Sequence, residues 1–203
     1  MDILNQNLDN YHALLFDFDG TLVDSMPIHN QAWIQIMADM GVHITERFLF
    51  ETMGLSSQRI VGIINEQKNL NLDPEEIARA KRDHYFKRLD QVKIVPQVFD
   101  IIKYYYQKKP LGIITGGSHE VVDKLLALLN IELYFNAVVC ADDTITGKDT
   151  SAPYMLACEQ LSVSPQNSLF FDDGDVGLKG AKLTGMDVIH VDVNHPDVFI
   201  DFI

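Results

Sequence analysis

Residues 12–21 read His-Ala-Leu-Leu-Phe-Asp-Phe-Asp-Gly-Thr, an apolar run that ends in two carboxylates and a glycine. A short, continuous apolar run bounded by turn residues is typical of a strand that is covered on both faces. Asp17 and Asp19 are two residues apart, so their side chains start on the same face of that strand. Gly20 then allows the chain to turn away sharply. This stretch therefore predicts a buried strand that carries two acids at its carboxyl end.

The same pattern returns further along the chain. Short apolar runs alternate with segments of helical periodicity, which indicates a parallel sheet with helices on both faces. The fold class predicted is therefore α/β, with a Rossmann-like doubly wound parallel sheet. The expected strands are His12–Phe18, Leu111–Thr115, Ala137–Cys140, Ser168–Phe171 and Val188–Val191, and the expected helices are Gln97–Gln107, Glu120–Leu129, Pro153–Leu161 and Val176–Leu183.

The stretch from about Pro27 to Asp90 breaks this alternation. It contains several helical patterns in succession and no convincing strand. So long a helical segment, inserted directly after the first strand, predicts a small helical cap domain over the sheet. The expected domains are an α/β core of residues 1–22 and 94–203 and an inserted cap of residues 23–93.

Composition excludes several classes of protein. The chain has 203 residues, of which 47% are hydrophobic, and a net charge of −13. This favours an ordinary globular protein and argues against nucleic-acid binding, which requires clustered lysine and arginine. The sequence contains neither a signal peptide nor an apolar stretch that could span a bilayer, so we expect a cytoplasmic protein without membrane contact. The two cysteines, Cys140 and Cys158, are expected to be buried thiols, and nothing requires more than a monomer.

Two other expected strands also end in polar groups. Leu-Gly-Ile-Ile is followed by Thr115-Gly116-Gly117-Ser118, and Ser-Leu-Phe-Phe is followed by Asp172-Asp173. Ligands of open parallel sheets bind at the carboxyl ends of the strands, so these groups are expected to meet Asp17 there. Several carboxylates at close quarters are costly unless a cation lies among them, and an all-oxygen set suits Mg²⁺.

The remaining groups favour phosphoryl chemistry. The backbone amides of Gly116 and Gly117, at the start of a helix, form a ready anion site. Lys148, in the loop after another strand, can neutralise a phosphoryl oxygen. Each feature alone has a simpler explanation, since Asp-x-Asp-Gly and Thr-Gly-Gly are common turns and Lys148 could be a solvated side chain. Their joint occurrence at strand ends favours a catalytic site.

These residues resemble the motifs of the haloacid dehalogenase-like hydrolases over almost the whole chain. The run from Phe16 to Ser25, Phe-Asp-Phe-Asp-Gly-Thr-Leu-Val-Asp-Ser, is similar to the first motif of that family nearly letter for letter. Thr115 matches the second motif, Lys148 the third, and Asp172-Asp173 the fourth. The resemblance implies a phosphoric monoester hydrolase with an α/β core and Mg²⁺ as cofactor.

The resemblance also implies a role for each motif residue. Asp17 would attack phosphorus and form an aspartyl-phosphate, while Asp19 would protonate the leaving oxygen and then activate water. The Mg²⁺ ligands would be Asp17, the backbone carbonyl of Asp19, Asp173, and Asp172 through a water. The phosphoryl oxygens would be held by Thr115, Gly116 and Lys148.

The position of the cap resembles the β-phosphoglucomutase-like subgroup, and within it small bacterial sugar phosphatases of the fructose-1-phosphate type. His29 and Trp33 are similar to the residues of that subgroup that lie over the site. Gly54 lies in a stretch that resembles its specificity loop, and Arg59 is nearby. Ordinary helix packing is the alternative explanation for His29 and Trp33, and a surface position is the alternative for Arg59. A small phosphorylated metabolite is the expected partner.

Some positions depart from the family pattern. The third motif usually continues with Pro, whereas here Asp149 follows the lysine, and Asp172 stands where Glu is common. The lysine and arginine that would hold a second phosphate in a mutase are replaced by Ser118 and Ser57. Hydrolysis is therefore favoured over a phosphohexomutase of the β-phosphoglucomutase kind. A noncatalytic sensor of phosphorylated metabolites is the third hypothesis, opposed by the intact acids of the first motif.

Overall fold

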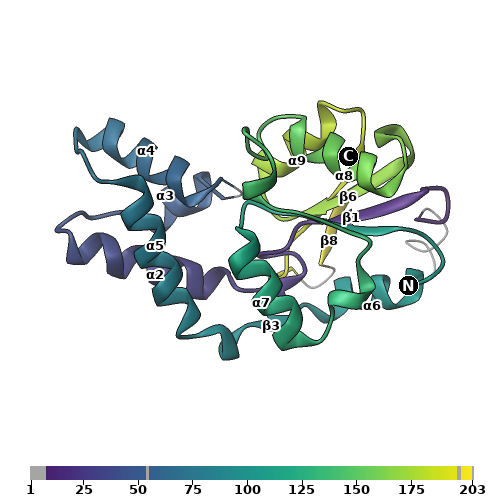
Figure 1. Cartoon of the computed structure of the whole chain (residues 1–203), viewed down its shortest axis with the longest axis horizontal. Coiled ribbons are helices and arrows are strands. Elements are labelled where there is room, and N and C mark those ends of the chain that lie inside the picture. Colours follow the sequence, from purple (N-terminus) through teal and green to yellow (C-terminus); the bar gives the residue numbers. More distant parts are fainter. Residues whose placement is uncertain (1–7, 54, 196–197, 203) are drawn as a thin grey trace.

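The computed structural model describes residues 8–53, 55–195 and 198–202 of the chain. A six-stranded sheet in the order β5-β4-β1-β6-β7-β8 forms its centre (Figure 1). The first five of these strands run parallel, and β8 is antiparallel to β7. The strands are β1 (Ala13–Phe16), β4 (Leu111–Ile114), β5 (Ala137–Val139), β6 (Ser168–Asp172), β7 (Asp187–Val191) and β8 (Phe199–Phe202).

The uninterrupted apolar sequence of β1 is explained by burial on both faces. Leu14 and Phe16 belong to a hydrophobic cluster with residues of α6 (Pro96–Tyr105) and α7 (His119–Leu129). Ala13 and Leu15 belong to a second cluster with residues of α8 (Ala152–Leu161) and α9 (Asp175–Lys182). Figure 1 shows the two helix pairs on opposite sides of the sheet. All four β1 side chains have no exposed surface, so no polar position is tolerated along the strand.

Four helices lie between the two strands of a small antiparallel ribbon and extend away from the sheet (Figure 1). Their side chains pack into a hydrophobic cluster of their own, with Trp33, Met37, Val61 and Ile64 at its centre. The domain boundaries expected from the sequence stay a prediction. The ribbon strands are β2 (Val23–Asp24) and β3 (Lys93–Ile94), and the helices are α2 (Met26–Asp39), α3 (Glu46–Glu51), α4 (Ser57–Lys68) and α5 (Pro74–Phe86).

The α/β class predicted from the sequence is confirmed. All five expected strands and all four expected helices of the core are present, with no end displaced by more than two residues. The prediction missed β8, so the sheet is not wholly parallel, and it missed the ribbon of β2 and β3. Two-residue strands carry no periodicity, and the ribbon forms only because its strands meet across the intervening helices. No helix in the described part of the chain is long and apolar enough to cross a membrane.

Candidate active site

Three acids meet at the carboxyl end of the sheet. Phe16 of β1 pairs with Phe171 of β6, so Asp17 and Asp172 follow side by side on neighbouring strands. The Asp17 N–H donates to the Phe171 carbonyl at 2.7 Å, which holds this register beyond the end of β1. Carboxylate oxygens of Asp17, Asp172 and Asp173 lie within 4.8 Å of one another. The sheet register therefore collects three negative charges in a largely buried place.

Lys148 lies among these acids. Its Nζ is 2.6 Å from Asp17 Oδ1 and 2.5 Å from Asp172 Oδ2, and its side chain is 2% exposed. Burial alone would lower the pKa of Lys148, but the charges of the two acids outweigh burial and raise it well above the ordinary value. Lys148 is therefore a fixed positive charge that is hydrogen-bonded to Asp17.

One lysine does not neutralise three acids. Burial and the charge of Asp172 outweigh the opposing effect of Lys148 and raise the pKa of Asp17 to about 7. Burial and the charges of Asp17 and Asp172 also raise the pKa of Asp173 well above its ordinary value. This excess of negative charge, carried on hard oxygen ligands, fits a divalent cation of the Mg²⁺ type. Asp17 and Asp173 are the side chains best placed to hold it, because Lys148 occupies the space between Asp17 and Asp172.

Glycines give this cluster the room it needs. Gly20 has a φ of 86°, and a Cβ there would overlap the Asp173 carboxylate. A Cβ on Gly177 would overlap Asp172 Oδ2 and lie 2.8 Å from Lys148 Cε. Gly180 approaches so closely that a Cβ would overlap the Lys148 carbonyl oxygen. Glycines in the turn after β1 and on α9 are therefore required, because any larger residue there would collide with the charged cluster.

Asp19 faces the cap helices instead of the acid cluster. Its Oδ1 accepts a hydrogen bond from Ser25 Oγ at 2.5 Å and lies 2.9 Å from His29 Nε2. Lys81 Nζ of α5 lies 2.7 Å from the other ring nitrogen of His29, Nδ1. Because the lysine ammonium can only donate, Nδ1 accepts and Nε2 carries the proton given to Asp19. Asp19 Oδ1 is thus engaged by groups of the cap side, and metal binding through the Asp19 backbone carbonyl stays a prediction.

The chain of contacts from Lys81 determines the charge of Asp19. Burial alone would raise the pKa of Asp19, but His29, the Ser25 hydroxyl and the charge of Lys81 lower it to about 2. The pKa of His29 is lowered by burial and by Lys81, so the ring is neutral at neutral pH. Burial lowers the pKa of Lys81 to about 8. The ring of His29 also stacks on Tyr85, with centroids 4.1 Å apart. Asp19 is thus a carboxylate oriented by groups of the cap.

A cleft of about 140 Å³ lies between the cap and the end of the sheet. Thr115 and Gly116 line its floor near Asp17, and the Thr115 hydroxyl accepts the Gly117 N–H at 3.0 Å. Lys148 lines a separate, smaller hollow that also includes Thr115 and Gly116. Lining residues on the cap side include Asn30, Trp33, Met53, Gln58, Lys81 and Arg82.

The cap residues named from the sequence have different surroundings. His29 and Trp33 line the cleft, the former in contact with Asp19. Arg59 instead forms an ion pair with Asp149 of the core, with the nearest N–O distance 2.9 Å. Asp149, the acid beside the lysine, thus pairs with a residue of the cap. Gly54 lies outside the described residues.

Sequence reasoning missed Ser25 and Lys81 as site residues. Ser25 is the last residue of the first motif, six positions after Asp19, and its hydroxyl contacts that acid directly. Lys81 lies 52 positions from His29 on a separate helix, so no local pattern could reveal the contact. The one local signal is that Lys81 and Tyr85 are four residues apart, which places both side chains on the same face of α5.

Comparison with known proteins identifies the family. A model described as haloacid dehalogenase-like hydrolase matches residues 14–191. The chain is 32% identical to the fructose-1-phosphate phosphatase YqaB of Escherichia coli, over 90% of this chain and 97% of that protein. It is 27% identical to a phosphorylated carbohydrates phosphatase of Thermotoga maritima, over 88% of this chain and 83% of that protein.

A solved structure supports the fold. A β-phosphoglucomutase from Clostridium difficile superposes with a TM-score of 0.80 at 21% identity, over 89% of this chain and 84% of that one. The predicted enzyme class, a phosphoric monoester hydrolase, is confirmed by the matching family together with the phosphatase relatives. The chain belongs to the haloacid dehalogenase-like hydrolases.

Proposed function

We propose that this protein is a Mg²⁺-dependent phosphatase of small sugar phosphates that works through an aspartyl-phosphate on Asp17. The observation that carries the proposal is that two acids close in sequence, Asp17 and Asp19, have different charged and hydrogen-bonding neighbours. Asp17 lies against Lys148 and two further acids, whereas Asp19 lies against His29 and Ser25 of the cap side. Two carboxylates held in different environments, two residues apart, suit a nucleophile and an acid–base residue.

The contacts of Asp17 favour its proposed role as the nucleophile. Lys148 binds one oxygen of Asp17, which favours the carboxylate form and leaves the second oxygen for attack on phosphorus. Thr115, the Gly116 backbone and Lys148, which line adjoining hollows at the end of the sheet, would bind the phosphoryl oxygens. Bound Mg²⁺ would supply positive charge to the phosphoryl oxygens, with Asp17, Asp173, the Asp19 carbonyl and Asp172 through a water as its ligands.

Asp19 is held ready for the second step. Its pKa of about 2 leaves it ionised at neutral pH, which is the form that takes a proton from water. In the first step it must instead give a proton to the leaving oxygen, so it must first be protonated as substrate enters. His29 of α2 contacts this acid and Lys81 of α5 contacts His29, so the orientation of Asp19 depends on the cap helices.

The substrate class is inferred from the cleft and the relatives. Lys81, Arg82, Gln58 and Asn30 line the cap side and can bind hydroxyl groups or a second anionic group of a small molecule. The relative in Escherichia coli is named for fructose 1-phosphate, and the one in Thermotoga maritima for phosphorylated carbohydrates. A hexose or pentose phosphate is therefore the expected substrate. Monomeric state, cytoplasmic location and the absence of nucleic-acid binding stay predictions.

The test is phosphate release from a panel of sugar phosphates and nucleotides, in Mg²⁺ and in EDTA. We expect metal-dependent release from a few sugar phosphates and none from Asp17→Asn, with the half-exposed Asp100→Asn as matched control. Acid-quenched wild-type protein is expected to carry a base-labile phosphoryl group that Asp17→Asn lacks. Conversion between hexose phosphate isomers without release would favour the mutase instead. Binding of sugar phosphates without any turnover would favour a sensor.

A further inference from the structure

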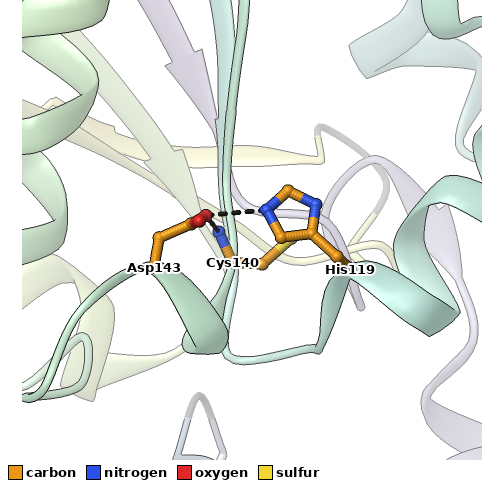
Figure 2. A group of neighbouring side chains, drawn as sticks. All are labelled: His119, Cys140 and Asp143. Atoms are coloured by element: carbon orange, nitrogen blue, oxygen red, sulfur yellow. Dashed lines mark hydrogen bonds and ion pairs between the residues drawn. The ribbon is translucent and has the colours of Figure 1, made fainter.

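A second group of side chains that can bind a metal ion lies one strand away from the acid cluster. His119 is the first residue of α7, which follows β4, and Cys140 directly follows β5. Asp143 is the last residue of the short 3-10 helix Ala141–Asp143. Since β4 and β5 are adjacent and parallel, their following residues meet at the same edge of the sheet. Figure 2 shows the three side chains directed toward one another.

The ligand atoms of this group are close together. One atom each of His119, Cys140 and Asp143 lies within 4.8 Å of the other two. The shortest separation is 2.8 Å, between His119 Nε2 and Asp143 Oδ2. Ligands of tetrahedral zinc lie about 2.0–2.3 Å from the ion, so movements of about one ångström would bring these atoms into place. A nitrogen, a sulfur and an oxygen donor together suit Zn²⁺ or Co²⁺ far better than Mg²⁺.

The surroundings of the group favour a cation. Asp123 Oδ1 lies 3.5 Å from His119 Nδ1, so a carboxylate orients the ring nitrogen that faces away from Asp143. This arrangement is typical of metal-binding histidines. Asp142 accepts the backbone N–H of His119 at 3.1 Å and adds another negative charge. The side chains of His119 and Asp143 are 37% and 29% exposed, which leaves an entry path for an ion.

Cys140 and Asp143 are held next to each other by a local backbone contact. The sulfur belongs to a turn already closed by the bond from the Cys140 N–H to Asp143 Oδ2 at 2.8 Å, so two of the ligands are held in place without metal.

We propose that His119, Cys140 and Asp143 form a binding site for a borderline transition-metal ion such as Zn²⁺, separate from the acid cluster of Asp17. The ligands are His119 Nε2, Cys140 Sγ and an Asp143 oxygen, with the fourth position open to water. Binding replaces the hydrogen bond between His119 and Asp143. The thiol proton of Cys140 and the Nε2 proton pass to solvent, so metal uptake releases protons.

A bound ion would affect the neighbouring loop of Thr115–Ser118, which is proposed to bind phosphate. The Ala141 N–H, next to Cys140, donates to the Gly117 carbonyl at 2.9 Å. The site therefore ties the start of α7 and the turn after β5 to the loop of Thr115–Ser118. Its expected role is structural support of that loop, outside the chemical step.

The test is titration of the metal-free, reduced protein with Co²⁺, in Mg²⁺ so that the acid cluster is occupied. Cobalt bound to a thiolate gives a near-ultraviolet charge-transfer band that carboxylate ligands do not give. We expect this band in the wild type and in Cys158→Ser, whose sulfur lies 3.9 Å from Ser168 in the core. We expect its loss in Cys140→Ser. Zn²⁺ added afterwards should abolish the band by displacement.

Surface variants keep the test independent of core packing. His119→Gln is expected to raise the dissociation constant for Co²⁺ at least tenfold. Asp123→Asn, which disturbs only the orienting carboxylate, should weaken binding by about 10–100-fold. The exposed Asp175→Asn is the matched control and should change nothing. Absence of the band in the wild type, its persistence in Cys140→Ser, or unchanged binding by His119→Gln would overturn the proposal.

Discussion

Replacing Lys148 by methionine tests the electrostatics of the acid cluster directly. Lys148 Nζ lies 2.6 Å from Asp17 and 2.5 Å from Asp172, and the lysine side chain is 2% exposed. Methionine fills much of the same space but leaves Asp17, Asp172 and Asp173 with no cation among them. Removing one partner of a buried ion pair costs about 3–5 kcal/mol. For a chain of this size that corresponds to a fall of about 6–20 °C in melting temperature.

The loss should depend on pH in a defined direction. Burial raises the pKa of Asp17 from 3.8 to about 7 even with Lys148 present, and removing the lysine raises it further. An acid whose pKa is raised by folding contributes stability that is complete below its unfolded pKa and is lost as pH rises through the folded pKa. Metal-free protein is therefore expected to be less stable at pH 8 than at pH 5.5. The difference between Lys148→Met and wild type should likewise be larger at pH 8.

The assay is calorimetric melting in EDTA at both pH values, followed by melting in Mg²⁺. The matched control is Lys179→Met on α9, whose ion pair with Asp175 is 3.3 Å long and highly exposed. Exposed pairs contribute about 0–1 kcal/mol, so this variant should melt close to wild type. Mg²⁺ should raise the melting temperature of Lys148→Met more than that of wild type, because the ion replaces the lost charge. Equal melting of the two lysine variants in EDTA at pH 8 would refute the reasoning.

Two further predictions concern packing and the cap. Gly180→Ala should cost about 1–3 kcal/mol in unfolding free energy, because its Cβ would overlap the Lys148 carbonyl. Gly62→Ala, which has no atom within 4 Å of the new Cβ, should stabilise by about 0.5–1 kcal/mol, and thermal melts of both variants compare them. Arg59→Gln and Asp149→Asn should show a coupling energy of about 0.2–1 kcal/mol in a double-mutant cycle on unfolding, since their ion pair is partly exposed. Strict additivity would show that this contact between cap and core contributes nothing to the free energy of unfolding.

The core of the fold could be predicted because its strands are covered on both faces. Burial on both faces makes residues 13–16 and 169–171 continuous apolar runs, and such runs are visible without any partner. The parallel sheet then requires that the residues after each run share one edge. The approach of Asp17 to Asp172 follows from these two facts, as does the expectation of a cation among the acids.

The prediction stopped where contacts join distant segments that have no pattern of their own. β8 was missed, as was the ribbon of β2 and β3, whose two-residue strands are too short to be recognised. Asp149 departs from the family pattern beside Lys148, and its partner is Arg59, which lies 90 positions away. A long-range ion pair depends on the relative placement of two packed bodies, and local periodicity contains no information on that placement.

The sequence by itself determined the α/β class, the inserted helices and the set of acids at the strand ends, because these depend on local apolar periodicity and on the rule that ligands meet at one edge of a parallel sheet. Only the tertiary structure decided which groups surround each acid. Lys148 reaches Asp17 across 131 positions, and Lys81 reaches His29 across 52. Desolvation and neighbouring charge determine a carboxyl pKa, and both arise only when the chain is folded. That is why Asp17 and Asp19, two residues apart, have pKa values of about 7 and about 2.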